Sequence, residues 1–176
     1  MPTLTLVLGG ARSGKSALAE RLAEGSGLRP LYVATAEAGD GEMAARIALH
    51  RARRGERWQT VEAPLDLAKA LNEVDRGQVV LIDCLTLWLS NLMHAGDPVE
   101  PAVDDLLAAA AEPSRPVVCV SNEVGLGIVP ENALARRFRD AQGALNQRVA
   151  AAAGLVVFVA AGLPLVLKGT LPGDPA

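Results

Sequence analysis

Short apolar runs alternate with longer mixed segments along this chain. The runs are rich in Val, Leu and Ile, as is typical of strands that are buried on both faces of a sheet. They cover residues 4–8, 31–34, 79–83, 117–120 and 155–159. Helices are predicted over residues 17–23, 42–54, 65–74, 85–93, 103–111 and 132–153. Gly162 and Pro164 indicate a turn, with a further strand after it.

This alternation predicts a parallel sheet with helices on both faces. We therefore expect an α/β fold of the P-loop, RecA-like type, with a doubly wound and mostly parallel sheet of about six strands. The length of 176 residues is that of a single domain. Residues 1–168 are expected to form this nucleotide-binding domain, and the Gly- and Pro-rich residues 169–176 to form a frayed tail.

Residues 149–167 are uncharged, and this stretch is long enough to cross a membrane. Gly154, Gly162 and Pro164 interrupt this stretch, so two strands are expected in it and no membrane span. The N-terminus lacks the basic segment of a secretion signal. Cys84 and Cys119 have neither the spacing of a zinc site nor that of a disulfide framework. A cytoplasmic location is therefore expected.

The charge balance excludes some partners. Asp and Glu number 20 against 17 Lys and Arg, which gives a formal net charge of −3. The chain therefore lacks the basic field that a nucleic-acid backbone attracts. Aromatic residues make up 3% of the chain, too few for the stacking surfaces of single-strand binders. We expect no nucleic-acid partner.

The strongest motif follows the first predicted strand and matches G-x-x-x-x-G-K-[ST]. Its residues are Gly9, Gly10, Ala11, Arg12, Ser13, Gly14, Lys15 and Ser16. Such a loop wraps phosphates with backbone N–H groups, and Lys15 neutralises the charge of the β- and γ-phosphates. Asp83 ends a buried strand, as in a Walker B element, and is expected to hold Mg²⁺ together with Ser16. The motif predicts ATP or GTP binding with magnesium, without naming the reaction.

His50 lies in a predicted basic helix. Helical spacing aligns it with Arg46, Arg53 and Arg54 on one face. Neighbouring cations disfavour the imidazolium, so the ring would stay neutral and able to attack phosphorus. Spacing alone favours a plainer interpretation, a solvated basic face that carries a histidine. The other histidine, His94, is expected to have a structural role at a helix end.

Four parts of the sequence resemble the bifunctional adenosylcobinamide kinase / adenosylcobinamide-phosphate guanylyltransferases of cobalamin biosynthesis. They are residues 9–16, 32–36, 42–58, and 122–132 together with 146–148. The first part is shared by all P-loop proteins, whereas the His-containing helix and the segment after Asn122 are specific to this family. The resemblance runs nearly from end to end.

The resemblance implies two successive reactions. A nucleoside triphosphate phosphorylates the hydroxyl of the corrinoid adenosylcobinamide, and GTP then transfers GMP through a histidine to that phosphate. His50 matches the guanylylated histidine, and a homotrimer is implied. The loop over residues 122–130 is expected to line the acceptor site. The positions that match GTP-binding segments of the family are Ala34, Thr35, Ala36, Arg51, Ala52, Arg53, Arg54 and Glu62.

Two other functions fit parts of the same sequence. One is a P-loop kinase of another small alcohol, with His50 as a surface residue, and guanylylation by GTP would distinguish the two kinases. The other is a RecA-like module whose nucleotide switches its binding to a nucleic acid or a partner. Hydrolysis stimulated by DNA would favour that module, and the acidic balance argues against it.

Overall fold

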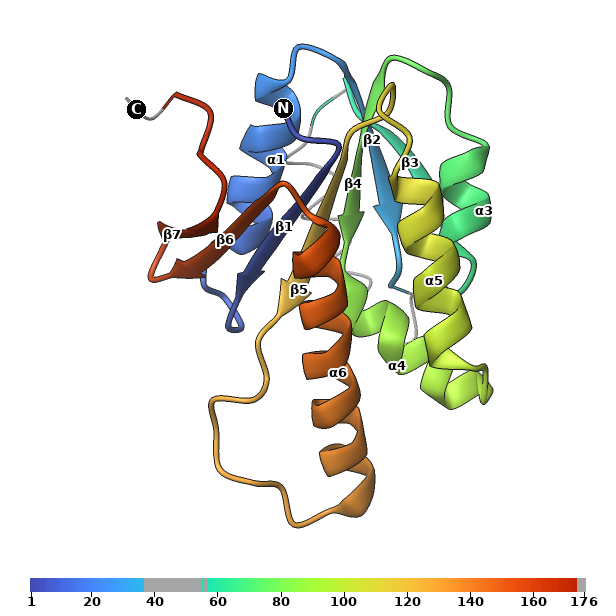
Figure 1. Ribbon diagram of the computed structural model, residues 1–176, viewed down its shortest axis with the longest axis vertical. Helices are drawn as coiled ribbons and strands as arrows, with labels where there is room; N and C mark the ends of the chain where they lie inside the picture. The colour runs from blue at the N-terminus through green and yellow to red at the C-terminus, as the bar shows by residue number, and fades with distance from the viewer. Residues whose placement is uncertain (37–54, 56, 174–176) are drawn as a thin grey trace.

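A computed structural model describes residues 1–36, 55 and 57–173 (Figure 1). Within these residues seven strands form one sheet in the order β3-β2-β4-β5-β1-β6-β7. The strands are β1 (Leu4–Gly9), β2 (Arg29–Ala34), β3 (Gln59–Glu62), β4 (Gln78–Asp83), β5 (Val117–Asn122), β6 (Leu155–Ala160) and β7 (Leu163–Lys168). Neighbouring strands are parallel except for β6 and β7, which form an antiparallel hairpin.

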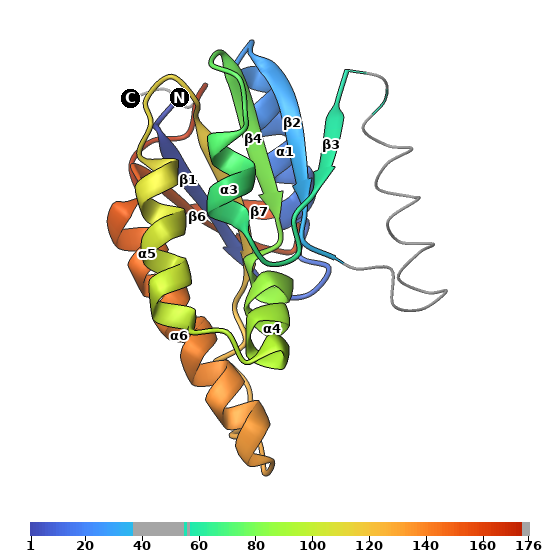
Figure 2. The ribbon, with the colours of Figure 1, turned by 90° about the vertical axis from the view of Figure 1, so that its right-hand side faces the viewer.

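Helices cover both faces of this sheet (Figure 2). They are α1 (Lys15–Gly25), α3 (Leu67–Asn72), α4 (Leu85–Ala95), α5 (Val99–Ala110) and α6 (Ala133–Ala152). The apolar side of α1 packs against one face, whereas α3, α4, α5 and α6 share the core on the other. The predicted doubly wound, RecA-like α/β fold is therefore confirmed.

Alternation along β5 determines which face each of its side chains meets. Cys119 belongs to the core beneath α3–α6, and Val120 to the core beneath α1. The same period of two directs Ser121 toward α6 and Asn122 toward the face of α1. Asn122 is in register with Gly9 of β1. β1 and β5 thus end side by side, and Gly9 and Asn122 lie on the same face of the sheet.

The hydrophobic pattern does not predict β3, which raises the number of strands above the expected count of about six. This edge strand is mostly exposed and contains a single strongly apolar residue, Val61. The predicted turn at Gly162 is confirmed, with φ of 52° at Ala161 and 81° at Gly162. Pro164 lies inside β7 instead, where an edge strand tolerates it. The helix predicted over residues 42–54 lies outside the described residues.

Local capping sets the ends of several helices. The Asp66 carboxylate accepts a hydrogen bond from Lys69 N at 2.9 Å where α3 begins. The Asn132 side chain accepts bonds from the first turn of α6, the shortest being 2.7 Å from Leu134 N. Gly96, with φ of 77°, ends α4 in the left-handed conformation. His94 lies in the last turn of α4, in agreement with a structural role.

The long uncharged stretch is divided among α6, β6 and β7, as the sequence predicts. Among the helices of the described residues, none combines the length and the apolar character that a membrane crossing requires.

Arg115 joins the carboxyl ends of two helices. Its side chain is buried, and the guanidinium donates to Leu71 O of α3 and, at 2.7 Å, to Ala109 O of α5. Burial lowers the pKa of Arg115 from its ordinary value. Arg115→Ala should lower the free energy of unfolding by about 2 kcal/mol, because Ala109 O loses its donor and a void forms.

Urea denaturation measures this loss, and Arg139→Ala is the matched control. Arg139 contacts its sequence neighbour Asp140 at the surface, so its removal should change the free energy of unfolding by less than about 0.5 kcal/mol. Equal losses in the two variants would show that Arg115 does not join the helices as described.

Candidate functional site

The glycine-rich loop connects β1 to α1 at the carboxyl edge of the sheet. Gly9 ends β1, and Gly14, with φ of 96°, immediately precedes α1. Arg12 also has a positive φ, of 56°. Gly162 N donates to Ser13 O at 2.8 Å, which ties the loop to the β6–β7 hairpin. The strand–loop–helix setting that a phosphate loop requires is therefore present.

Lys15 lies across this loop. Its ammonium donates to Gly10 O at 3.0 Å, and the residue is 9% exposed. Burial lowers the pKa of Lys15, while interactions with Cys84 and with the Asp83 carboxylate act in the opposite direction. The end of β4 is thus within electrostatic reach of the loop, and a bound polyphosphate would further stabilise the charged ammonium.

Three of the predicted site residues end neighbouring strands. Ala34 of β2 is in register with Glu62 of β3 and with Asp83 of β4. One strand, β5, separates β4 from β1. Glu62 is four strands away from β1, roughly 19 Å at about 4.8 Å per strand spacing. The structure therefore brings Asp83 near the phosphate loop and keeps Glu62 apart from it.

Thr35 follows β2 and is fully buried. Its hydroxyl donates to Cys84 O and accepts from Cys84 N, both at 2.8 Å. Asn91 Nδ2 donates to Thr35 O at 2.8 Å, while Ala36 beyond it is half-buried. The Thr35 side chain thus holds the end of β2 to the start of α4. Burial, with Asp83 nearby, raises the pKa of Cys84 to about 11, so this thiol is neutral near pH 7.

A buried polar network, which was not predicted from the sequence, lies beneath the end of β5. Gln142 Nε2 donates to Ser121 Oγ at 2.9 Å and to Asn146 Oδ1 at 3.0 Å. Ser121 Oγ donates to Asn146 Oδ1 at 2.6 Å. The available signals were the four-residue spacing of Gln142 and Asn146 on one helix face and the polar end of an apolar strand.

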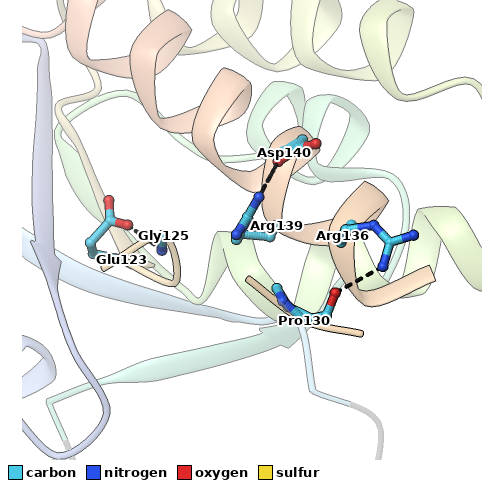
Figure 3. Close-up of polar contacts among 6 residues, drawn as sticks. All are labelled: Glu123, Gly125, Pro130, Arg136, Arg139 and Asp140. Atoms are coloured by element: carbon cyan, nitrogen blue, oxygen red, sulfur yellow. Dashed lines mark hydrogen bonds and ion pairs between the residues drawn. The ribbon is translucent and has the colours of Figure 1, made fainter. Parts of the chain in front are cut away.

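The loop after β5 projects beyond the sheet before the chain returns as α6 (Figure 1). The Glu123 carboxylate accepts a bond from Gly125 N, and Arg136 Nη1 donates to Pro130 O at 2.9 Å (Figure 3). Leu126 and Ile128 are 83% and 97% exposed. The loop thus begins at the edge that carries the phosphate loop and presents apolar side chains to solvent.

The predicted magnesium ligands are Ser16, in the first turn of α1, and Asp83. Their hydroxyl and carboxylate oxygens are hard donors of the kind that Mg²⁺ prefers. Residues 1–36, 55 and 57–173 contain no group of three His, Cys, Asp or Glu side chains that could hold a metal. This donor set fits a metal that takes its other ligands from phosphates and water.

The remaining predicted residues have no described position. His50, Arg51, Ala52, Arg53 and Arg54 lie outside the described residues. The nucleophile and the basic run beside it therefore stay predictions.

A family described as cobinamide kinase / cobinamide phosphate guanyltransferase matches residues 5–167. This chain belongs to that family. It is therefore an enzyme, a bifunctional kinase and guanylyltransferase, as the sequence predicts.

Relatives in the family match over almost their whole length. The bifunctional adenosylcobalamin biosynthesis protein CobP of Pseudomonas aeruginosa is 53% identical over 167 residues, 93% of this chain and 96% of the relative. The bifunctional adenosylcobalamin biosynthesis protein CobU of Escherichia coli K12 is 41% identical over 181 residues, 94% of this chain and 99% of the relative.

One solved structure with a similar fold is a protein of Pyrococcus horikoshii OT3. It has a TM-score of 0.55 at 10% identity, and the match covers 94% of this chain and 86% of that one. At this identity the similarity concerns the fold alone.

Proposed function

We propose that this chain phosphorylates adenosylcobinamide with a nucleoside triphosphate and then transfers GMP from GTP to the new phosphate, giving adenosylcobinamide-GDP and pyrophosphate. The observation that carries the proposal is a complete phosphate loop, with Lys15 near Asp83, in a member of this family. The reactants and the two free, buried cysteines favour a cytoplasmic location.

The kinase step is assigned to the phosphate loop. Its backbone N–H groups and Lys15 would bind the β- and γ-phosphates, and Ser16 and Asp83 would hold Mg²⁺. When bound, the metal neutralises phosphate charge. The acceptor hydroxyl forms a bond to the γ-phosphorus and releases its proton to water, while the bond from that phosphorus to the diphosphate breaks. The exposed loop after Asn122 is proposed to line the acceptor site.

Transfer of GMP needs a second attacking group, because a loop around the β- and γ-phosphates supplies none at the α-phosphorus. We assign the attack to His50. Its imidazole nitrogen forms a P–N bond as pyrophosphate leaves, and an oxygen of the corrinoid phosphate then displaces the histidine. The arginines of residues 51–54 would attract the polyphosphate and keep the ring neutral.

The guanosine side is assigned to the other end of the sheet edge. The residues proposed for it are Ala34, Thr35, Ala36 and Glu62, in addition to Arg51, Ala52, Arg53 and Arg54. Their separation from the phosphate loop, roughly 19 Å for Glu62, favours a nucleotide region distinct from the kinase loop.

Product analysis tests this function. Incubation with adenosylcobinamide, ATP, GTP and magnesium should give the corrinoid phosphate first and the corrinoid-GDP adduct later, both resolved by mass. A reaction that stops at the phosphate despite excess GTP would contradict the guanylyl transfer. Phosphorylation of another small alcohol, with no corrinoid product, would support the plain kinase instead.

Asp83→Asn should raise the magnesium concentration for half-maximal kinase activity by about tenfold, because the amide keeps the size but loses the charge. A magnesium titration measures the shift. Asp75→Asn removes the same charge from an exposed position next to the amino end of β4 and should leave the titration unchanged. A curve for Asp83→Asn that overlays the wild type would rule out its role in metal binding.

We propose that the chain assembles as a homotrimer. Leu163, Leu165 and Leu167 on the edge strand β7 are 72%, 59% and 57% exposed. A row of exposed leucines on an unpaired sheet edge is typical of surfaces that associate. Sedimentation equilibrium at micromolar concentration should give about three times the 18.3 kDa of one chain. A mass near 18.3 kDa would contradict the trimer.

A further inference from the structure

We infer that Asn122 binds the terminal phosphate of the nucleoside triphosphate in the phosphate loop and thereby distinguishes triphosphates from diphosphates. The inference rests on the proposed function, since it takes the loop to hold the phosphate donor. Asn122 is not among the residues that the motifs assign to nucleotide binding.

The backbone of Asn122 is held from two helices. Its N–H donates to Thr86 Oγ1 of α4 at 2.9 Å, and its carbonyl accepts from Asn146 Nδ2 of α6 at 3.1 Å. Asn146 is itself fixed by Gln142 and Ser121, which are fully buried. The network on the α6 face thus fixes the position of Asn122 without using its side chain.

The side chain of Asn122 faces the other side of the sheet, toward α1, by the alternation of β5. Its Oδ1 atom is buried and receives no hydrogen bond from the described part of the chain. An amide oxygen buried without a donor destabilises a protein by about 1–3 kcal/mol. Such an atom beside a binding loop is explained if a ligand supplies the missing partner.

The phosphate loop begins at the strand position that is in register with Asn122. Asn122 is in register with Gly9, where a Cβ atom would stand only 2.5 Å from Ser13 Oγ. Ser13 therefore covers Gly9, and Gly9 itself lies one strand spacing of about 4.8 Å from β5. Ser13 Oγ is also buried with no partner among the described residues. Two unsatisfied side-chain oxygens thus lie on neighbouring chain segments at this edge.

The strand order indicates which phosphate Asn122 meets. β5 separates β1, which leads into the loop, from β4, which ends at Asp83. Ser16 and Asp83 would hold a metal that neutralises phosphate charge, and a polyphosphate that extends from the loop toward Asp83 would place its γ-phosphate over the end of β5. An asparagine amide can turn to present Nδ2 as the donor to a phosphate oxygen. A diphosphate lacks the group that this amide would contact.

Equilibrium binding tests the inference with ATP and ADP, and with GTP and GDP as a second pair, all with magnesium. Asn122→Ala should raise the Kd of the triphosphate about tenfold, the usual effect of losing a hydrogen bond to a charged group. The Kd of the diphosphate should change less than about twofold. Asn122→Asp should weaken triphosphate binding at least as much, through repulsion of like charges.

Asn72→Asp is the matched control, because it adds the same charge at an exposed position at the end of α3, next to the amino end of β4. It should leave both affinities unchanged. Unaltered binding by both Asn122 variants, or equal weakening for triphosphate and diphosphate, would overturn the inference. Thermal unfolding identifies any variant that fails to fold. If one of the two Asn122 variants fails to fold, the other Asn122 variant provides the test. A wild type that binds no triphosphate would refute the proposed function as well.

Discussion

Lys15→Ala is expected to lower kcat/KM of the kinase step by about a hundredfold or more, because the developing charge on the phosphates then lacks its ammonium. In the structure this ammonium is held at the loop by Gly10 O and lies near Asp83. Transfer of labelled γ-phosphate from ATP to adenosylcobinamide measures the loss.

Lys69→Ala is the control for this change. Lys69 is exposed on α3, on the face of the sheet opposite to α1, so its removal should leave turnover within about twofold of wild type. Near-normal turnover of Lys15→Ala would show that the loop does not bind the transferred phosphate.

His50→Ala is expected to lower formation of the corrinoid-GDP adduct by roughly a thousandfold or more, because no other nucleophile is assigned to the α-phosphorus. The same variant should keep most of its kinase activity, since phosphate transfer relies on Lys15, Ser16 and magnesium and needs no covalent enzyme intermediate. Mass analysis of both products in one reaction separates the two effects.

His94→Ala provides the matched control. The His94 ring lies 2.7 Å from Ser90 O within α4, so it interacts with its own helix. Its loss should alter neither activity beyond a small change in stability. Persistent GMP transfer by His50→Ala, or a loss confined to His94→Ala, would assign the nucleophile elsewhere.

Elements that bury apolar side chains could be predicted from the sequence. The apolar runs predicted all the central strands, but β3 buries little and therefore left no pattern. The helix expected from residue 103 begins at Val99, because Pro101 is tolerated in a first helical turn. The helix expected from residue 65 begins later, because Asp66 caps its start.

The sequence likewise predicts one part of the candidate site and leaves the other part unpredicted. The phosphate loop is a continuous segment between a strand and a helix, so its sequence alone indicates its geometry. The network of Ser121, Gln142 and Asn146 joins two elements, and nothing in either segment indicates that they meet. The position of Asn122 between the loop and Asp83 depends on the order of the strands, which hydrophobic periodicity does not determine.

The covalent guanylyl-histidine is the central claim, and GTP labelled at the α-phosphate tests it most directly. After incubation with the wild-type protein and denaturing electrophoresis, the label should stay on the chain, survive alkali and be released by acid, as a phosphoramidate requires. Peptide mapping should place it on His50. A chain without label, an acid-stable label, or a label on another residue would contradict the account.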